Sequence, residues 1–161
     1  MTPQAPPPQP PVRPAVALVF CLIGFFALTV AGLGLASLAT DSDVIAVRGL
    51  GLWPGVIGIA AAVAAFAGTV WSAVRRVRPS FGAVVVVVVG TWLAYVLVTG
   101  LVAVIVAADL GAGIAVTGGL AVGWPGLVVA AAALVAGWSA IALVRTGAAR
   151  PRWPWEHDDE E

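Results

Sequence analysis

Charged residues divide the chain into long uncharged stretches, and this pattern restricts the fold more than any other feature of the sequence. Each stretch can hold an apolar helix of about 20 residues, enough to cross about 30 Å of hydrocarbon. Hydrophobic residues make up 61% of the 161 residues and charged residues only 10%. A water-soluble fold of this length has too little interior for so much apolar surface. The sequence therefore predicts an all-α integral membrane protein. Its uncharged stretches run from Arg13 to Asp41, Arg48 to Arg75, Arg78 to Asp109 and Asp109 to Arg145.

The same pattern divides the chain into two tails and one transmembrane domain. Residues 1–14 are rich in proline, cannot form a helix and are expected to be a disordered tail. Residues 145–161 are expected to be a second tail. The fourth stretch is longer than one span, and its glycine-rich first part, residues 110–123, is expected to be an apolar loop. The transmembrane domain, residues 15–144, is expected to hold helices at about 15–39, 53–74, 81–107 and 125–144.

The distribution of arginine predicts the orientation. All eight basic residues are arginine, and in a four-span arrangement only Arg48 falls on the same side as Asp41, Asp43 and Asp109. Cytoplasmic segments of membrane proteins carry an excess of Arg and Lys. Both termini are therefore expected in the cytoplasm, and the host membrane is expected to be the plasma (inner) membrane. The arginines at helix ends to which we assign this topological role are Arg75, Arg76, Arg78 and Arg145.

A tripeptide recurs in the two halves of the chain. Trp53-Pro54-Gly55 returns as Trp124-Pro125-Gly126, and an apolar helix ending in arginine is expected after each. Proline suits the first helical position because its missing N–H would be unpaired there. The chain is therefore interpreted as two hairpin-like halves. The repeat fits an internal duplication, and it fits equally a general tendency of membrane helices to begin with an aromatic residue and proline.

Small residues recur at helical spacing on two of the expected helices. Such stripes let helix backbones approach closely in a membrane, although a helix this rich in alanine also produces them by chance. We predict that the second and fourth helices pack through these residues. They are Ala60, Ala64, Gly68 and Ser72 on the second helix and Ala132, Ala136 and Ala140 on the fourth.

Polar groups are scarce within the expected spans. Thr91, Tyr95 and Thr99 form one stripe on the third helix, where they can bond across helices, face a polar path or bond carbonyls of their own helix. No expected helix carries Asp, Glu, His, Lys or Arg away from its ends, and membrane carriers and enzymes act through such groups. With one cysteine, Cys21, and one histidine, His157, no catalytic site, metal site or cofactor is expected.

From Val16 to Arg78 the chain resembles the small membrane subunit of tripartite tricarboxylate transporters, the TctB-like family. The resemblance rests on the first span, the loop Arg48-Gly49-Leu50-Gly51-Leu52, the entry Trp53-Pro54 and the Ala-rich helix that ends at Arg75-Arg76. It implies a four-span accessory subunit, without enzymatic activity, beside a large permease and a periplasmic solute receptor. The second half departs from the family pattern at Trp124-Pro125-Gly126.

Two functions follow as hypotheses. The first is a non-enzymatic accessory or scaffolding subunit of a larger membrane transport assembly, which the small-residue stripes favour. The second is a homo-oligomeric pore or permeation protein, which the Thr91–Tyr95–Thr99 stripe favours. The expected partners are the lipid bilayer and another membrane protein or a second copy of the chain. Nothing in the sequence indicates nucleic acid.

Overall fold

The computed structural model describes residues 14–45, 50–75 and 82–146, and these residues form five α-helices and no strand. Four of the described helices are long and apolar enough to cross a membrane, so the all-α, four-span prediction is confirmed. Residues 1–13 of the predicted N-terminal tail, Arg76, Arg78 and residues 147–161 lie outside the described residues, whereas Pro14, Arg145 and Thr146, predicted to lie in the two tails, belong to the first and last helices. The helices are α1 (Pro14–Thr40), α2 (Trp53–Val74), α3 (Ala83–Ala107), α4 (Leu110–Val122) and α5 (Trp124–Thr146).

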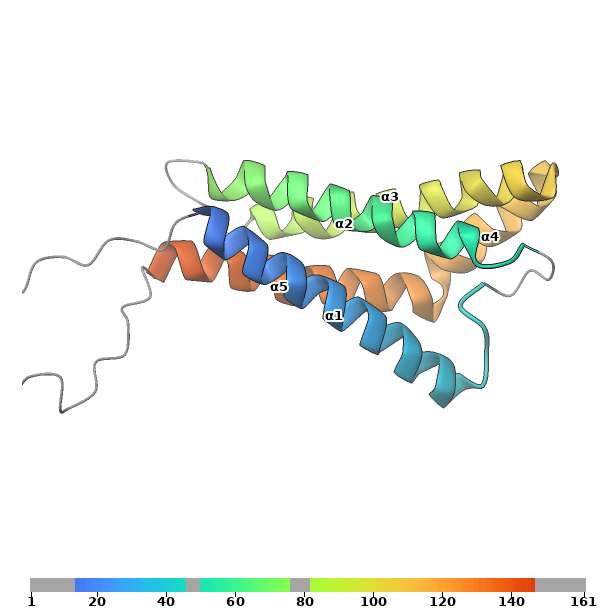
Figure 1. Cartoon of the computed structure of the whole chain (residues 1–161), viewed down its shortest axis with the longest axis horizontal. Helices are drawn as coiled ribbons and strands as arrows, with labels where there is room; N and C mark the ends of the chain where they lie inside the picture. The colour runs from blue at the N-terminus through green and yellow to red at the C-terminus, as the bar shows by residue number, and fades with distance from the viewer. Residues whose placement is uncertain (1–13, 46–49, 76–81, 147–161) are drawn as a thin grey trace, which may run out of the picture.

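The four long helices lie side by side, and the shorter α4 folds back along the last part of α3 (Figure 1). The first residue of α1 and the last residue of α5 lie at the same end of the bundle, called here the terminal end. The α3–α4 turn and the segment after α1 lie at the opposite end. The most extensive packing joins α2 to α3 and α1 to α5, so the two halves of the chain interlock. Among the described residues α1 and α3 make no direct helix–helix contact and lie diagonally across the bundle.

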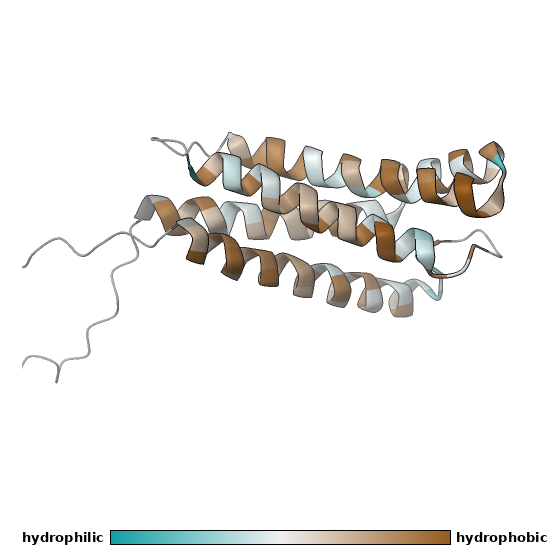
Figure 2. Ribbon diagram, turned by 45° about the horizontal axis from the view of Figure 1, so that its top comes forward, coloured by the Kyte–Doolittle hydropathy of each residue, from teal (hydrophilic) through white to brown (hydrophobic). Residues whose placement is uncertain are grey.

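Bulky apolar side chains cover the outside of the bundle. Phe20 on α1 is 72% exposed and Ile105 on α3 is 69% exposed. Figure 2 shows apolar residues along the helices, with the most hydrophilic positions near the two ends. Exposed apolar surface of this extent is rare in soluble monomers, whereas hydrocarbon solvates it readily. The chain is a multi-pass membrane protein.

Residues 110–123 were expected to be an apolar loop, but residues 110–122 form the helix α4 instead. The prediction was wrong because it weighed the low helix propensity of glycine above the capping signal at Asp109. The Asp109 carboxylate accepts hydrogen bonds from the backbone N–H groups of Gly111, at 2.9 Å, and Ala112, at 3.3 Å. In apolar surroundings a helix also satisfies backbone groups that a loop would leave unpaired.

Both Trp-Pro-Gly tripeptides begin a helix. Trp53 is the first residue of α2 and Trp124 is the first residue of α5, and the proline that follows each is buried. The two surroundings differ, because α4 precedes Trp124 and joins α5 through Gly123, whose backbone is extended. No helix is present in the described part of residues 41–52 before Trp53. The second half of the chain thus contains a short helix without a counterpart in the described part of the first half.

Candidate functional site

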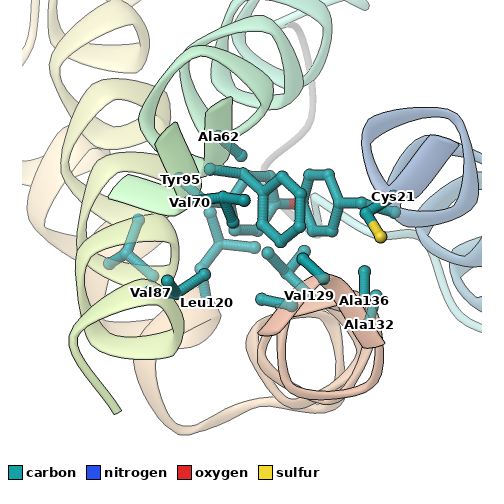
Figure 3. Close-up of a cluster of buried hydrophobic side chains, with 14 of the residues drawn as sticks. Cys21, Ala62, Val70, Val87, Tyr95, Leu120, Val129, Ala132 and Ala136 are labelled. Atoms are coloured by element: carbon teal, nitrogen blue, oxygen red, sulfur yellow. The ribbon is translucent and has the colours of Figure 1, made fainter. Parts of the chain in front are cut away.

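The predicted polar stripe on α3 lies inside the bundle. Thr91, Tyr95 and Thr99 are each 0% exposed. The Thr99 hydroxyl donates a hydrogen bond to the Tyr95 carbonyl of its own helix at 2.6 Å. Figure 3 shows the Tyr95 side chain within the apolar cluster, with its oxygen in red at the centre. A stripe sealed within one chain is not available to line a pore between copies.

Thr29 on α1 is a further buried hydroxyl, which the sequence analysis missed. It is 0% exposed, and it is the only threonine between Pro14 and Ala39. Its isolation within a long apolar run was a signal that could have identified it. The hydroxyl oxygens of Thr29, Thr91 and Tyr95 have no hydrogen-bond partner among the described residues. Burying an unpaired hydroxyl costs about 1–3 kcal/mol, so these three groups require an explanation.

Two aromatic rings form the centre of the apolar core. Phe25 on α1 and Phe66 on α2 stack with their ring centroids 4.5 Å apart and their planes inclined by 7°. Both side chains are 0% exposed. Tyr95, Val129 and Ala132 surround the same region in Figure 3. The stack fixes how α1 lies along α2, although these helices pack on each other less extensively than α2 packs on α3.

The small-residue stripes of the two predicted helices have different positions. Ala132, Ala136 and Ala140 on α5 are buried. The stripe on α2 consists of Ala60, Ala64, Gly68 and Ser72 and is exposed. The prediction that α2 packs through this stripe is therefore wrong for packing against the other helices of the same chain. A Cβ atom at Gly68 would meet no heavy atom within 4 Å among the described residues.

The bundle uses another face of α2 because that face combines a bulky residue with a very small one. Its members recur every four residues and are buried: Pro54, Gly58, Ala62, Phe66 and Val70. Gly58 lies so close to Thr99 on α3 that an added Cβ atom would overlap the threonine hydroxyl and approach its Cβ atom to 3.1 Å. The alanine-rich sequence offers several small-residue faces, so spacing alone did not single out this one.

The opposite end of the bundle contains a cavity of about 220 Å³. It lies between residues 42–45, which follow α1, and the junction of α4 with α5. The Trp124 indole N–H donates a hydrogen bond to the Ser42 hydroxyl at 3.1 Å and so joins the two walls. Asp43 is the one charged residue among the described lining residues, and most of the others are apolar. The cavity thus sits where the α1–α2 connection meets the break between α4 and α5.

The described charged side chains near the helix ends are exposed, as is Trp71, whereas Trp124 is half-buried. The Arg75 guanidinium carbon lies over the Trp71 ring, 5.0 Å from its centroid, a distance typical of a cation–π contact. Asp41, Asp43 and Asp109 are exposed at the opposite end. Arg76 and Arg78 lie outside the described residues, as does the side chain of Arg145. Arg75 is therefore the one predicted topological arginine whose side chain the structure describes.

A protein-family model matches residues 13–161, which is nearly the whole chain, and its description is DUF6121, a family of unknown function. The chain belongs to DUF6121. No curated protein and no solved structure matches it. The DUF6121 match includes all five described helices, so the entire bundle lies within one family unit.

The arrangement in this DUF6121 protein offers two kinds of interaction. Its interior holds hydroxyl groups that can donate and accept hydrogen bonds. Its outer surface carries bulky apolar side chains on α1 and α3 and small residues along the middle of α2. Among the described residues, no group of three or more His, Cys, Asp or Glu side chains is placed to hold a metal ion. The described residues thus offer hydrogen bonding within the bundle and packing of helices or lipid against its surface.

Proposed function

We propose that this DUF6121 protein is a non-enzymatic accessory or scaffolding subunit of a larger membrane transport assembly, and that it docks through α2. The observation that carries the proposal is the exposed stripe of Ala60, Ala64, Gly68 and Ser72. The Ser72 hydroxyl is already satisfied by the Thr69 carbonyl at 2.8 Å, so a partner need not supply a polar group for it. Small residues in a membrane helix let a second helix approach closely and gain dispersion contacts.

The outer faces of α1 and α3 differ from that of α2. Their exposed side chains are bulky, as at Phe20, Leu38, Val86 and Leu101. Fluid lipid chains fill the spaces around such side chains easily, whereas the flat middle of α2 offers them little side-chain surface. The partner proposed for α2 is a transmembrane helix of another membrane protein. The resemblance of residues 16–78 to a transporter subunit supports a large permease as this partner.

Photocrosslinking from α2 tests the docking face. A photoreactive residue is placed at Ala64 in the full chain in its native membrane, and a matched one replaces Val86 on α3, which is 64% exposed. We expect Ala64 to form an adduct of defined size with a second membrane protein, which mass spectrometry then identifies as a permease. Gly68→Leu should abolish this adduct because a bulky side chain separates the two helices. The Val86 position should react only with lipid.

Three outcomes would count against the docking face. Adducts of equal yield at Ala64 and Val86 would indicate random collisions. An unchanged adduct in the Gly68→Leu variant would show that close approach at this stripe is not needed. Adducts only with further copies of the chain would replace the accessory role with self-association.

The orientation is also a proposal, and it rests on the seven-to-one arginine distribution. In a Cys21→Ala background, we expect Asp43→Cys to react with an impermeant thiol reagent added outside intact cells. Ser80→Cys, between α2 and α3 in the sequence, should react only after the membrane is opened. Reaction of Ser80→Cys from outside in intact cells would reverse the proposed orientation.

A further inference from the structure

The centre of the bundle contains hydroxyl groups from two helices that lie across its diagonal. Thr29 belongs to α1, and Thr91 and Tyr95 belong to α3, on the diagonal of the bundle. In four-helix bundles, side chains on facing helices build ligand sites in this central space. We propose that the centre is a hydration site, in which water bridges the Tyr95 hydroxyl to those of Thr29 and Thr91.

Contacts along α2 place Thr29 and Tyr95 at the same depth in the bundle. The stack of Phe25 on Phe66 aligns α1 with α2. Because these helices run in opposite directions, one turn beyond Phe25 brings Thr29 level with Ala62. The close approach of Gly58 to Thr99 aligns α2 with α3, and one turn inward on both helices brings Ala62 level with Tyr95.

Contacts with α5 place Thr29 and Tyr95 within about one helical turn of each other. A Cβ atom at Gly32 on α1 would lie 2.7 Å from Val128, so Thr29, about one turn back, lies near the level of Ala132. A Cβ atom at Gly137 would lie 3.2 Å from Val87 on α3, which places Tyr95 near the level of Val129. Ala62 on α2 and Ala132 on α5 therefore lie near the level of Thr29, and both have short side chains, whereas Val129 lies near the level of Tyr95.

The threonines in this layer behave unlike other threonines of the bundle. Thr69 and Thr99 donate to carbonyls of their own helices, at 2.7 and 2.6 Å, as threonine commonly does in membrane helices. Thr29 and Thr91 make no such bond, although both are fully buried. Each hydroxyl has one donor and two acceptor positions, and a buried water typically makes two to four hydrogen bonds. Water between α1 and α3 would satisfy three groups that the protein leaves unpaired.

Solid-state NMR of the full chain in liposomes tests the site, because Tyr95 is the only tyrosine. With ring-labelled tyrosine, every tyrosine signal reports on this position. We expect magnetisation to pass from water to the Tyr95 ring, and we expect Thr29→Val to remove most of that transfer. Thr69→Val is the matched control, since its hydroxyl bonds within α2, and it should leave the transfer unchanged.

A double-mutant cycle supplies a second readout. Thr29→Val and Tyr95→Phe should each lower the ratio of folded to unfolded protein about threefold, the change that an average interhelical hydrogen bond in a membrane protein confers. The double variant should lose less than the product of the two changes, because both remove the same bridge. Absence of transfer to Tyr95, transfer that persists in Thr29→Val, or a rise in stability in Tyr95→Phe would each overturn the hydration site. An energetic coupling between Thr29→Val and Tyr95→Phe without magnetisation transfer from water would instead indicate a direct hydrogen bond between the two side chains.

Discussion

Gly58→Leu is expected to destabilise the bundle by about 3 kcal/mol, at the upper end of the cost of overpacking a core. Gly58 is buried where α2 packs on α3, and an added Cβ atom alone would overlap the Thr99 hydroxyl. A leucine there must separate the pair of helices that packs most extensively in the structure. The free energy of unfolding in bicelles, measured by steric trapping, gives the size of the loss.

Two further comparisons make the Gly58 prediction specific. Gly68→Leu introduces the same side chain on the same helix, where no heavy atom of the described residues lies within 4 Å of a Cβ atom, and it should leave the stability of the isolated chain nearly unchanged. A Gly58→Ala variant adds only the Cβ atom that overlaps the Thr99 hydroxyl. In that variant, Thr99→Ala should restore part of the lost stability, since it removes the overlapping hydroxyl. Equal losses in Gly58→Leu and Gly68→Leu would contradict the packing described for α2.

Phe66→Ala is expected to cost about 3 kcal/mol, within the range for truncating a buried aromatic residue. Its ring stacks on Phe25 of α1, and its Cε2 atom lies 4.0 Å from the position of a Cβ atom on Gly137 of α5. Phe66 thus fills the space where three helices meet. Lipid is as apolar as the core, so the loss comes from the cavity and missing dispersion contacts rather than from transfer into water.

Phe20→Ala is the control for Phe66→Ala. Phe20 is 72% exposed on α1, and lipid can occupy the space that its ring leaves. Thermal unfolding of both variants in the same bicelles should show a large decrease in Tm for Phe66→Ala and little change for Phe20→Ala. A larger decrease for Phe20→Ala would mean that the apolar core is not centred on the Phe25–Phe66 stack.

The spacing of charges was enough to predict the four long helices. A membrane helix must be long, apolar and uncharged, so the limits set by Arg13, Asp41, Arg75 and Asp109 lie close to helix ends in the structure. The short α4 did not follow from the same reasoning, because glycine weakens helices in water. In this setting a single capping carboxylate and the need to satisfy backbone groups outweigh that cost.

The sequence was less informative about which helix face turns inward. A membrane helix is apolar all round, so the periodicity that marks the buried face of a soluble helix is missing from α2. Gly58 and the exposed Gly68 look alike in the sequence, and only the position of Thr99 on α3 separates their roles. Thr29 was missed because a single hydroxyl forms no stripe, and its burial follows only from the positions of the helices around it.

Flux across liposomes that contain only this protein tests the accessory role most directly. Its spans carry no Asp, Glu, His, Lys or Arg between their ends, and ion-coupled carriers keep such groups in the membrane for function. Thr91, Tyr95 and Thr99 are sealed inside the bundle. We therefore expect the purified protein to move no ion or small solute above the rate of protein-free liposomes. A protein-dependent flux that the double substitution Thr91→Val and Thr99→Val abolishes would contradict the accessory role and establish a pore.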